Sequence, residues 1–179
     1  MLNARFWTIV GMILGAAAVR LLPHPWNFTP IGAMALFGGA TFRDRRLAFA
    51  VPLAALFLGD LAIGLHKLMW AVYGAFALMV FLGMGLRGRR RFVPVAATTL
   101  AGSLLFFVVT NFAVWLSGMT YPETFGGLVT CYVAAIPFFG NTIAGDAFYA
   151  ALLFGSFAML EHRIPALREA FSAHGTAQI

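Results

Sequence analysis

The sequence predicts an all-α integral membrane protein, in which a single domain of residues 1–179 crosses the bilayer six times. The composition, the lengths of the apolar segments and the placement of the basic residues all support this fold class. Hydrophobic residues make up 61% of the chain and charged residues only 10%, against about 45–50% and about 25% in soluble domains. A water-soluble fold of this size could not cover so much apolar surface, whereas lipid accepts it.

A helix needs about 20 residues to cross about 30 Å of hydrocarbon. Six apolar segments approach this length, although the second is short and rich in glycine. The predicted transmembrane helices cover residues 6–22, 30–42, 47–65, 68–86, 92–116 and 139–160. The first segment resembles a signal peptide, but the rest of the chain is equally apolar, so we interpret it as an uncleaved first span.

Residues 117–137 separate the last two predicted spans. This stretch begins with polar residues and is too polar for a full span. Its second part, residues 125–136, predicts an extra interfacial or re-entrant helix that ends before Pro137, because proline disrupts a helix interior.

The basic residues give the predicted orientation, because Lys and Arg collect in cytoplasmic segments. With the N-terminus inside, ten of the twelve basic residues lie on the cytoplasmic side. These ten are Arg5, Arg43, Arg45, Arg46, Arg87, Arg89, Arg90, Arg91, Arg163 and Arg168. Only Arg20 and Lys67 lie outside. We therefore expect a multi-pass plasma membrane protein with both termini in the cytoplasm.

Several function classes are disfavoured. The net charge of +6 follows from the cytoplasmic loops, so we expect no nucleic-acid partner. The single cysteine, Cys131, excludes an intrachain disulfide and a CxxC metal site. The sequence contains no GxxxxGK[ST] motif, no HExxH motif and no arrangement that suggests a Ser-His-Asp set. We expect no enzyme activity, no cofactor and no bound metal.

Polar residues in the predicted spans lie near the extracytoplasmic side, and the inner halves are almost free of them. Arg20 ends the first span, Asp60 lies in the outer third of the third span, and Asn111 lies in the outer part of the fifth. Asn141 and Asp146 lie in the outer half of the last span. This asymmetry favours an outward-facing polar cavity over a pore or a proton relay, which need polar groups across the bilayer.

Residues 21–30 form a loop that three prolines stiffen, so it is either a lid over the cavity or a tight connection. Its polar side chains and those of the loop after the fifth span complete the predicted site. The candidate substrate-binding residues are Arg20, His24, Trp26, Asn27, Asp60, Asn111, Tyr121, Glu123, Asn141 and Asp146.

Each of these residues also has a purely structural interpretation. Asp60 and Asp146 could both pair with Arg20 and tie three helices together. The amides of Asn111 and Asn141 could join neighbouring helices by hydrogen bonds. His24 and His66 could simply be solvated, and Cys131 could be a small buried apolar residue.

Small residues spaced four apart let helices approach closely. The first span carries Gly11 and Gly15, and the second carries Ala35 and Gly39. These pairs serve either packing inside the protein or contact with a partner.

Residues 20–39, 110–115 and 135–141 resemble an uncharacterised bacterial family of membrane transport proteins. The match continues through residues 121–122, 126–128 and 145–146. More distantly, the architecture is similar to the substrate-capture S-components of energy-coupling factor (ECF) vitamin transporters. That resemblance implies six helices, a ligand pocket near the outer face under the first loop, and docking of the first helix onto a transmembrane coupling subunit driven by ATPases. Gly11 and Gly15 would provide the docking surface.

We therefore expect a substrate-binding subunit for uptake of a small, vitamin-like organic molecule. Two alternatives remain open from the sequence. One is a structural or assembly protein whose outer polar residues pair with each other and leave no cavity. The other is a membrane enzyme acting on lipids, whose candidate catalytic residues would be His24, His66 and Glu123.

Overall fold

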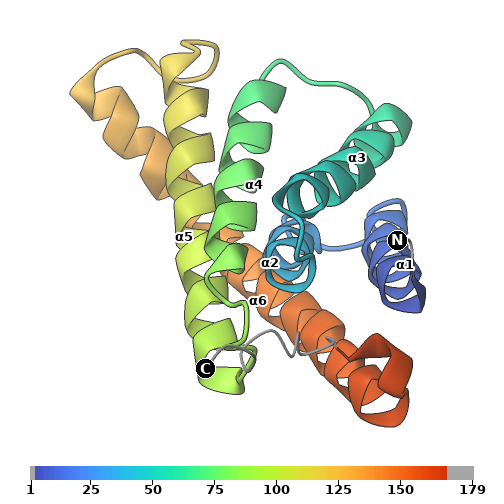
Figure 1. The fold of residues 1–179 in the computed structure, drawn as a ribbon. Coiled ribbons are helices and arrows are strands. Elements are labelled where there is room, and N and C mark those ends of the chain that lie inside the picture. The colour runs from blue at the N-terminus through green and yellow to red at the C-terminus, as the bar shows by residue number, and fades with distance from the viewer. Residues whose placement is uncertain (1–2, 169–179) are drawn as a thin grey trace, which may run out of the picture.

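The computed structural model describes residues 3–168, and all regular secondary structure in this part of the chain is helical (Figure 1). The six helices are α1 (Ala4–Val19), α2 (Ile31–Thr41), α3 (Arg45–Ile63), α4 (Met69–Met84), α5 (Phe92–Leu116) and α6 (Phe125–Arg163), followed by a 3₁₀ turn, η1 (Pro165–Leu167). The predicted all-α class is confirmed, and each predicted apolar segment coincides with a helix.

Helices α3, α5 and α6 are long and apolar enough to cross a membrane, whereas α1, α2 and α4 are shorter apolar helices. With 11 residues, α2 is about 16 Å long. This is roughly half of the hydrocarbon thickness of a bilayer. The outside of the protein carries large apolar side chains such as Trp7, Phe81 and Phe92, which is typical of a surface that faces lipid.

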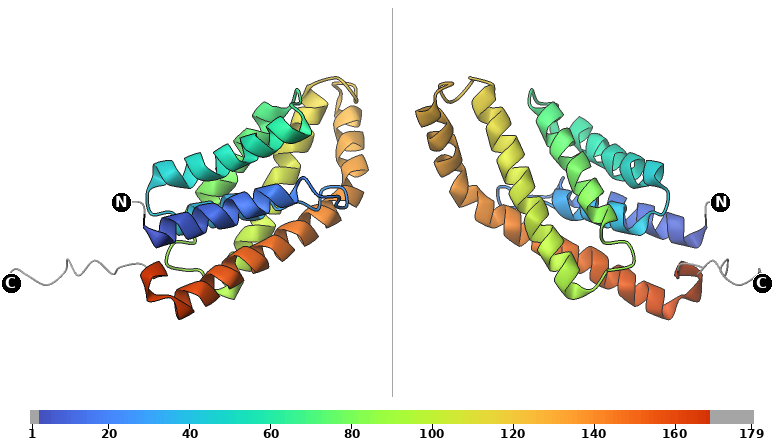
Figure 2. Two further views of the ribbon diagram at one scale, coloured as in Figure 1. Left: turned by 90° about the vertical axis from the view of Figure 1, so that its right-hand side faces the viewer. Right: turned by 60° about the vertical axis from the view of Figure 1, so that its left-hand side comes forward.

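The prediction of a separate helix that ends before Pro137 is wrong. Helix α6 continues through Pro137 for 39 residues, so the expected interfacial helix is the first arm of α6. Figure 2 shows that this arm and the remainder of α6 run in different directions. Proline removes one backbone hydrogen bond and clashes with the preceding turn, and a bend accommodates both effects without ending the helix.

The short helix α2 lies at the centre of the bundle and contacts all five other helices (Figure 1). Every residue of α2 after Ile31 is buried. Its closest neighbour is α4, because glycines let the two backbones meet. A Cβ atom on Gly39 would lie 2.1 Å from the carbonyl oxygen of Val80, and one on Gly83 would lie 2.3 Å from that of Leu36.

Charged side chains bind the terminal peptide groups of α2, which have no hydrogen-bond partner within the helix itself. At its N-terminus, the Asp146 carboxylate accepts hydrogen bonds from the N–H groups of Gly32 and Ala33. At its C-terminus, Arg87 Nε donates to the Gly39 carbonyl at 3.0 Å, and Arg5 donates to the Thr41 carbonyl at 3.4 Å. An acidic group at the N-terminus and basic groups at the C-terminus both complement the helix dipole.

An ionic cluster closes the end of the bundle where α1 begins and α6 ends. The Glu161 carboxylate binds the guanidinium groups of Arg5 and Arg90. Both guanidinium groups also lie over the ring of Phe157, at 5.0 and 5.6 Å from its centre. This cluster joins α1, α6 and the start of α5 at the end predicted to be cytoplasmic.

The two small-residue pairs have different surroundings. Gly39 packs inside the protein against α4, as described above. In contrast, Gly11 and Gly15 are exposed, and a Cβ atom on either would meet nothing within 4 Å. Packing inside the bundle therefore explains the pair of Ala35 and Gly39 but not the pair of Gly11 and Gly15.

We expect Gly83→Ala to destabilise the protein by about 1–3 kcal/mol, because the added methyl group would overlap the backbone of α2. Gly74→Ala, on an open face of the same helix, should be neutral or stabilise it by up to about 1 kcal/mol. Unfolding of both variants in mixed micelles of increasing denaturing detergent would measure the difference. Equal stability of the two variants would contradict the tight packing of α2 on α4.

Candidate functional site

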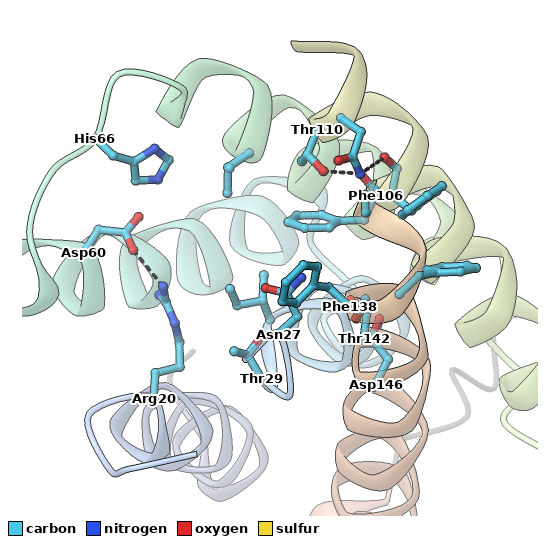
Figure 3. A pocket seen from close by; sticks show the side chains of 17 residues that line it. Arg20, Asn27, Thr29, Asp60, His66, Phe106, Thr110, Phe138, Thr142 and Asp146 are labelled. Atoms are coloured by element: carbon cyan, nitrogen blue, oxygen red, sulfur yellow. Dashed lines mark hydrogen bonds and ion pairs between the residues drawn. The ribbon is translucent and has the colours of Figure 1, made fainter. Parts of the chain in front are cut away.

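A cavity of about 350 Å³ lies between α1 and α3 on one side and α5 and α6 on the other (Figure 3). The N-terminus of α2, at Ile31 and Gly32, forms part of its lining. So do Asn27 and Thr29 from the loop before α2, and His66 from the loop after α3. In the left view of Figure 2, these two loops lie at the end of the bundle opposite the start of α1.

Arg20 and Asp60 form an ion pair in the wall of this cavity. Arg20 Nη2 lies 2.8 Å from Asp60 Oδ1, and the Tyr73 hydroxyl donates to Asp60 Oδ2 at 2.8 Å. Gly59 leaves room for the guanidinium group, since a Cβ atom there would lie 3.0 Å from Arg20 Nη1. The three side chains come from α3, α4 and the end of α1, so they join these helices and leave no net charge.

Asp146 does not pair with Arg20, so the predicted three-helix ion pair is wrong for this aspartate. Its side chain is 3% exposed and points from α6 to the N-terminus of α2. Besides the two N–H groups of α2, the Ser103 hydroxyl donates to Asp146 Oδ2 at 2.7 Å. A Cβ atom on Gly32 would lie 2.3 Å from Asp146 Oδ1, so the carboxylate requires glycine there. Asp146 thus holds α2, α5 and α6 together at the cavity.

Four phenylalanines from two helices give the cavity an aromatic wall. Phe106 and Phe107 come from α5, and Phe138 and Phe139 come from α6. The rings of Phe107 and Phe139 pack against each other at a tilt of 33°, with their centres 4.5 Å apart.

Polar side chains lie among these rings. Thr110 from α5 and Thr142 from α6 line the same space (Figure 3), as does Asn111 from α5. Each donates to the carbonyl of the residue four positions earlier in its own helix. The Asn111 side-chain oxygen and the threonine lone pairs can still accept hydrogen bonds. Apolar rings with a few polar groups are typical of small-molecule sites.

Five of the ten predicted site residues line the cavity: Arg20, Asn27, Asp60, Asn111 and Asp146. The other five, His24, Trp26, Tyr121, Glu123 and Asn141, lie outside its lining. Trp26 is 80% exposed, and its carbonyl accepts a hydrogen bond from Asn141 Nδ2 at 2.9 Å. Asn141 thus fastens the first loop to α6. His24 is exposed in the same loop, and Glu123 is exposed in the loop before α6.

The first loop packs down onto α6. Phe28 lies against the rings of Phe148 and Tyr149, and a Cβ atom on Gly145 would lie 3.0 Å from the backbone nitrogen of Thr29. Asn27 has a φ of 62°, a conformation that asparagine adopts more readily than most residues. The loop therefore packs closely against α6, and its Asn27 and Thr29 reach the cavity.

The first arm of α6 is attached to α5 beside the cavity. The Cys131 thiol lies 3.4 Å from the Asn111 carbonyl, and the Tyr132 hydroxyl donates to the Val108 carbonyl at 2.7 Å. Trp115 Nε1 donates to the carbonyls of Pro122 and Thr124 in the connecting loop. Cys131 is 1% exposed, in agreement with its interpretation as a small buried residue.

Sequence reasoning did not select Tyr73, Ser103, Thr110, Thr142 or the four phenylalanines. Hydroxyl groups within apolar segments were the available signal for the first four, because such groups seek partners inside a membrane protein. The phenylalanines carry no comparable signal among 19 in the chain.

Within residues 3–168, no three His, Cys, Asp or Glu side chains gather in a way that could hold a metal ion. Of the three residues considered for a lipid-modifying enzyme, only His66 lines the cavity. His24 and Glu123 lie outside it, so these three side chains do not lie together in the cavity.

Residues 1–167 match a family described as a family of unknown function, DUF6580. The chain belongs to the DUF6580 family. No curated protein and no solved structure matches it. The expected membership of an uncharacterised family is confirmed, while the transport function of this DUF6580 protein stays a prediction.

In this DUF6580 protein, Asp146→Ala should destabilise the fold by about 3 kcal/mol, because it leaves two buried N–H groups of α2 without their charged acceptor. Ser103→Ala should cost only about 1 kcal/mol, since it removes one donor and leaves the contact with α2 intact. Detergent-induced unfolding of both variants would measure this order. A larger loss for Ser103→Ala would contradict the role given to Asp146.

Proposed function

We propose that this protein is the substrate-binding subunit of a membrane uptake transporter and binds a small, vitamin-like organic molecule. The observation that carries the proposal is the cavity beside the N-terminus of α2, lined by both aromatic and polar side chains. Its volume of about 350 Å³ lies within the range of about 300–1,000 Å³ usual for ligand sites.

The cavity favours this function over a purely structural role. A structural protein needs its polar residues paired, and Arg20, Asp60 and Tyr73 do pair. Pairing nevertheless leaves an open space bordered by Asn111, Thr142 and the aromatic rings. Helix packing alone does not require such a space.

The proposed topology has six membrane-spanning helices, as in an ECF S-component, with both termini in the cytoplasm. The loops at residues 20–26, 64–68 and 117–124 then lie on the outer side, residues 27–30 lead inward to α2, and the ionic cluster of Arg5, Arg90 and Glu161 lies inside. Since α2 is about 16 Å long, its N-terminus and the cavity beside it lie near mid-membrane. The substrate would therefore enter from the extracytoplasmic side between the loops.

Recognition in this proposal depends on shape, stacking and hydrogen bonds rather than on free charge. Arg20 is already paired with Asp60 and orients that carboxylate. Asn27, Asn111 and Thr142 present polar atoms to the substrate, and the phenylalanines contact its flat apolar part. A neutral or weakly charged ring compound with polar substituents fits this lining.

Release to the cytoplasm needs energy, and the sequence contains no nucleotide-binding motif. A transmembrane coupling subunit with ATPases would supply it by reorienting the whole substrate-binding subunit in the bilayer. The face of α1 that carries Gly11 and Gly15 is uncovered and is the proposed docking surface.

The binding site can be tested by filling it. Ala135 lines the cavity, whereas Ala134 is exposed on the neighbouring face of α6. Ala135→Phe should lower the amount of small molecule that copurifies with the detergent-solubilised protein at least tenfold, and Ala134→Phe should leave it unchanged. Mass spectrometry of extracts from equal amounts of folded protein would measure the bound compound.

Loss of the compound in both variants, or in neither, would contradict a binding site in this cavity. If wild-type protein carries no compound, a thermal-shift screen of vitamins against the same three proteins replaces the extraction. A screen with no stabilising compound for wild type would overturn the proposal.

The topology can be tested with a membrane-impermeant maleimide in a Cys131→Ala background. Lys67→Cys and Arg89→Cys each place one thiol in an exposed loop at opposite ends of the bundle. Lys67→Cys should react in intact cells, and Arg89→Cys should react only after permeabilisation. The reverse pattern would overturn the proposed orientation.

A further inference from the structure

A second cavity, of about 560 Å³, lies between the first half of α5 and the second half of α6. The right view of Figure 2 shows the two helices crossing and then separating toward this end. Its walls are almost entirely apolar, and α6 contributes the small residues Ala147, Ala151, Gly155 and Ala158. We call this space the α5–α6 groove.

Positive charge lies at one end of the groove. Arg90 and Arg91, at the start of α5, are part of its lining. Arg91 is exposed, and within residues 3–168 its side chain has no hydrogen bond or ion pair. Arg90 shares the single carboxylate of Glu161 with Arg5. Arg90 and Arg91 therefore place two guanidinium groups at this end of the groove, and Glu161 binds only Arg90 of the two, so this end carries positive charge.

We propose that the α5–α6 groove is a binding site for an anionic phospholipid. One acyl chain lies along the small residues of α6, and the phosphate group binds Arg91 and the outer face of Arg90. An apolar channel with cations at one end matches an amphiphile that has an apolar chain and a negative head. The inference rests on the proposed membrane setting, in which this end of α5 lies at the cytoplasmic surface, but not on the nature of the transported molecule.

The groove and the substrate cavity meet at one hydrogen bond. Ser103 is part of the groove lining, and its hydroxyl donates to Asp146, which is part of the cavity lining. The far end of the acyl chain would therefore cover the contact between α5 and α6 directly behind the substrate cavity. The lipid would stabilise the helix pair that carries the aromatic wall.

A neighbouring helix is the other occupant that small residues on α6 would allow. An apolar helix gains nothing from two arginines at one end of the groove, whereas a phosphate group does. The charge at the groove end therefore favours the lipid.

The test is native mass spectrometry of the full chain in detergent with added phosphatidylglycerol or phosphatidylcholine of identical acyl chains. Wild type should retain phosphatidylglycerol in preference to phosphatidylcholine. Arg91→Gln should weaken retention of phosphatidylglycerol about fivefold, because one arginine contact with an anionic lipid is lost. Arg46→Gln is the matched control, since Arg46 is also exposed and lies outside the groove lining.

A second variant tests the apolar part of the groove. Gly155→Leu should reduce retention of both lipids, because its side chain would fill the space where nothing now lies within 4 Å. Gly74→Leu adds the same side chain to an open face of α4 and should change nothing. If the Gly155→Leu protein does not fold, the Arg91→Gln and Arg46→Gln pair decides the question.

Equal retention of the two lipids by wild type, or equal weakening by Arg91→Gln and Arg46→Gln, would overturn the proposal. So would a disulfide between two copies of a Gly155→Cys, Cys131→Ala protein in membranes, because it would place a neighbouring chain in the groove. The lipid assay uses no transported molecule, so its failure is distinguishable from failure of the cavity-filling experiment.

Discussion

The binding of charged side chains to both ends of α2 is the interaction on which the rest of the bundle depends. A helix surrounded by apolar helices has no water to bind its terminal peptide groups, and each unbonded group is costly. Asp146 accepts from the first N–H groups, and Arg87 and Arg5 donate to the last carbonyls. With these groups satisfied, α2 can be apolar in every residue before Thr41 and contact all five other helices.

The same arrangement explains why a cavity exists. Because α2 is too short to fill the length of the bundle, the space beyond its N-terminus is bordered by the longer helices, the loop that leads into α2 and the loop after α3. Asp146 therefore belongs to both the fold and the site, since one carboxylate orders α2 and lines the cavity. Arg20 and Asp60 also have two roles, because their ion pair joins helices and both side chains line the opposite wall of the cavity.

Hydropathy and charge predicted where the helices are, because both depend on residue type alone. The continuity of α6 was not predictable in this way, since whether Pro137 bends or ends a helix depends on its neighbours. Polarity at a given depth singled out Arg20, Asp60, Asn111 and Asp146, all of which line the cavity, but depth does not reveal in which direction a side chain points. It could not show that Asn141 points to the first loop or that Asp146 binds α2 instead of Arg20.

The position of Asp146 on the last helix has a consequence for biosynthesis. The ribosome completes α2 more than a hundred residues before it adds Asp146, which is about 10 s at ordinary translation rates. During that interval the N-terminus of α2 lacks its acceptor, so the nascent chain cannot reach its final arrangement however early its other helices enter the membrane. Chains truncated before α6 would therefore present an incomplete α2 to the quality-control proteases of the cell, whereas chains that include α6 would not.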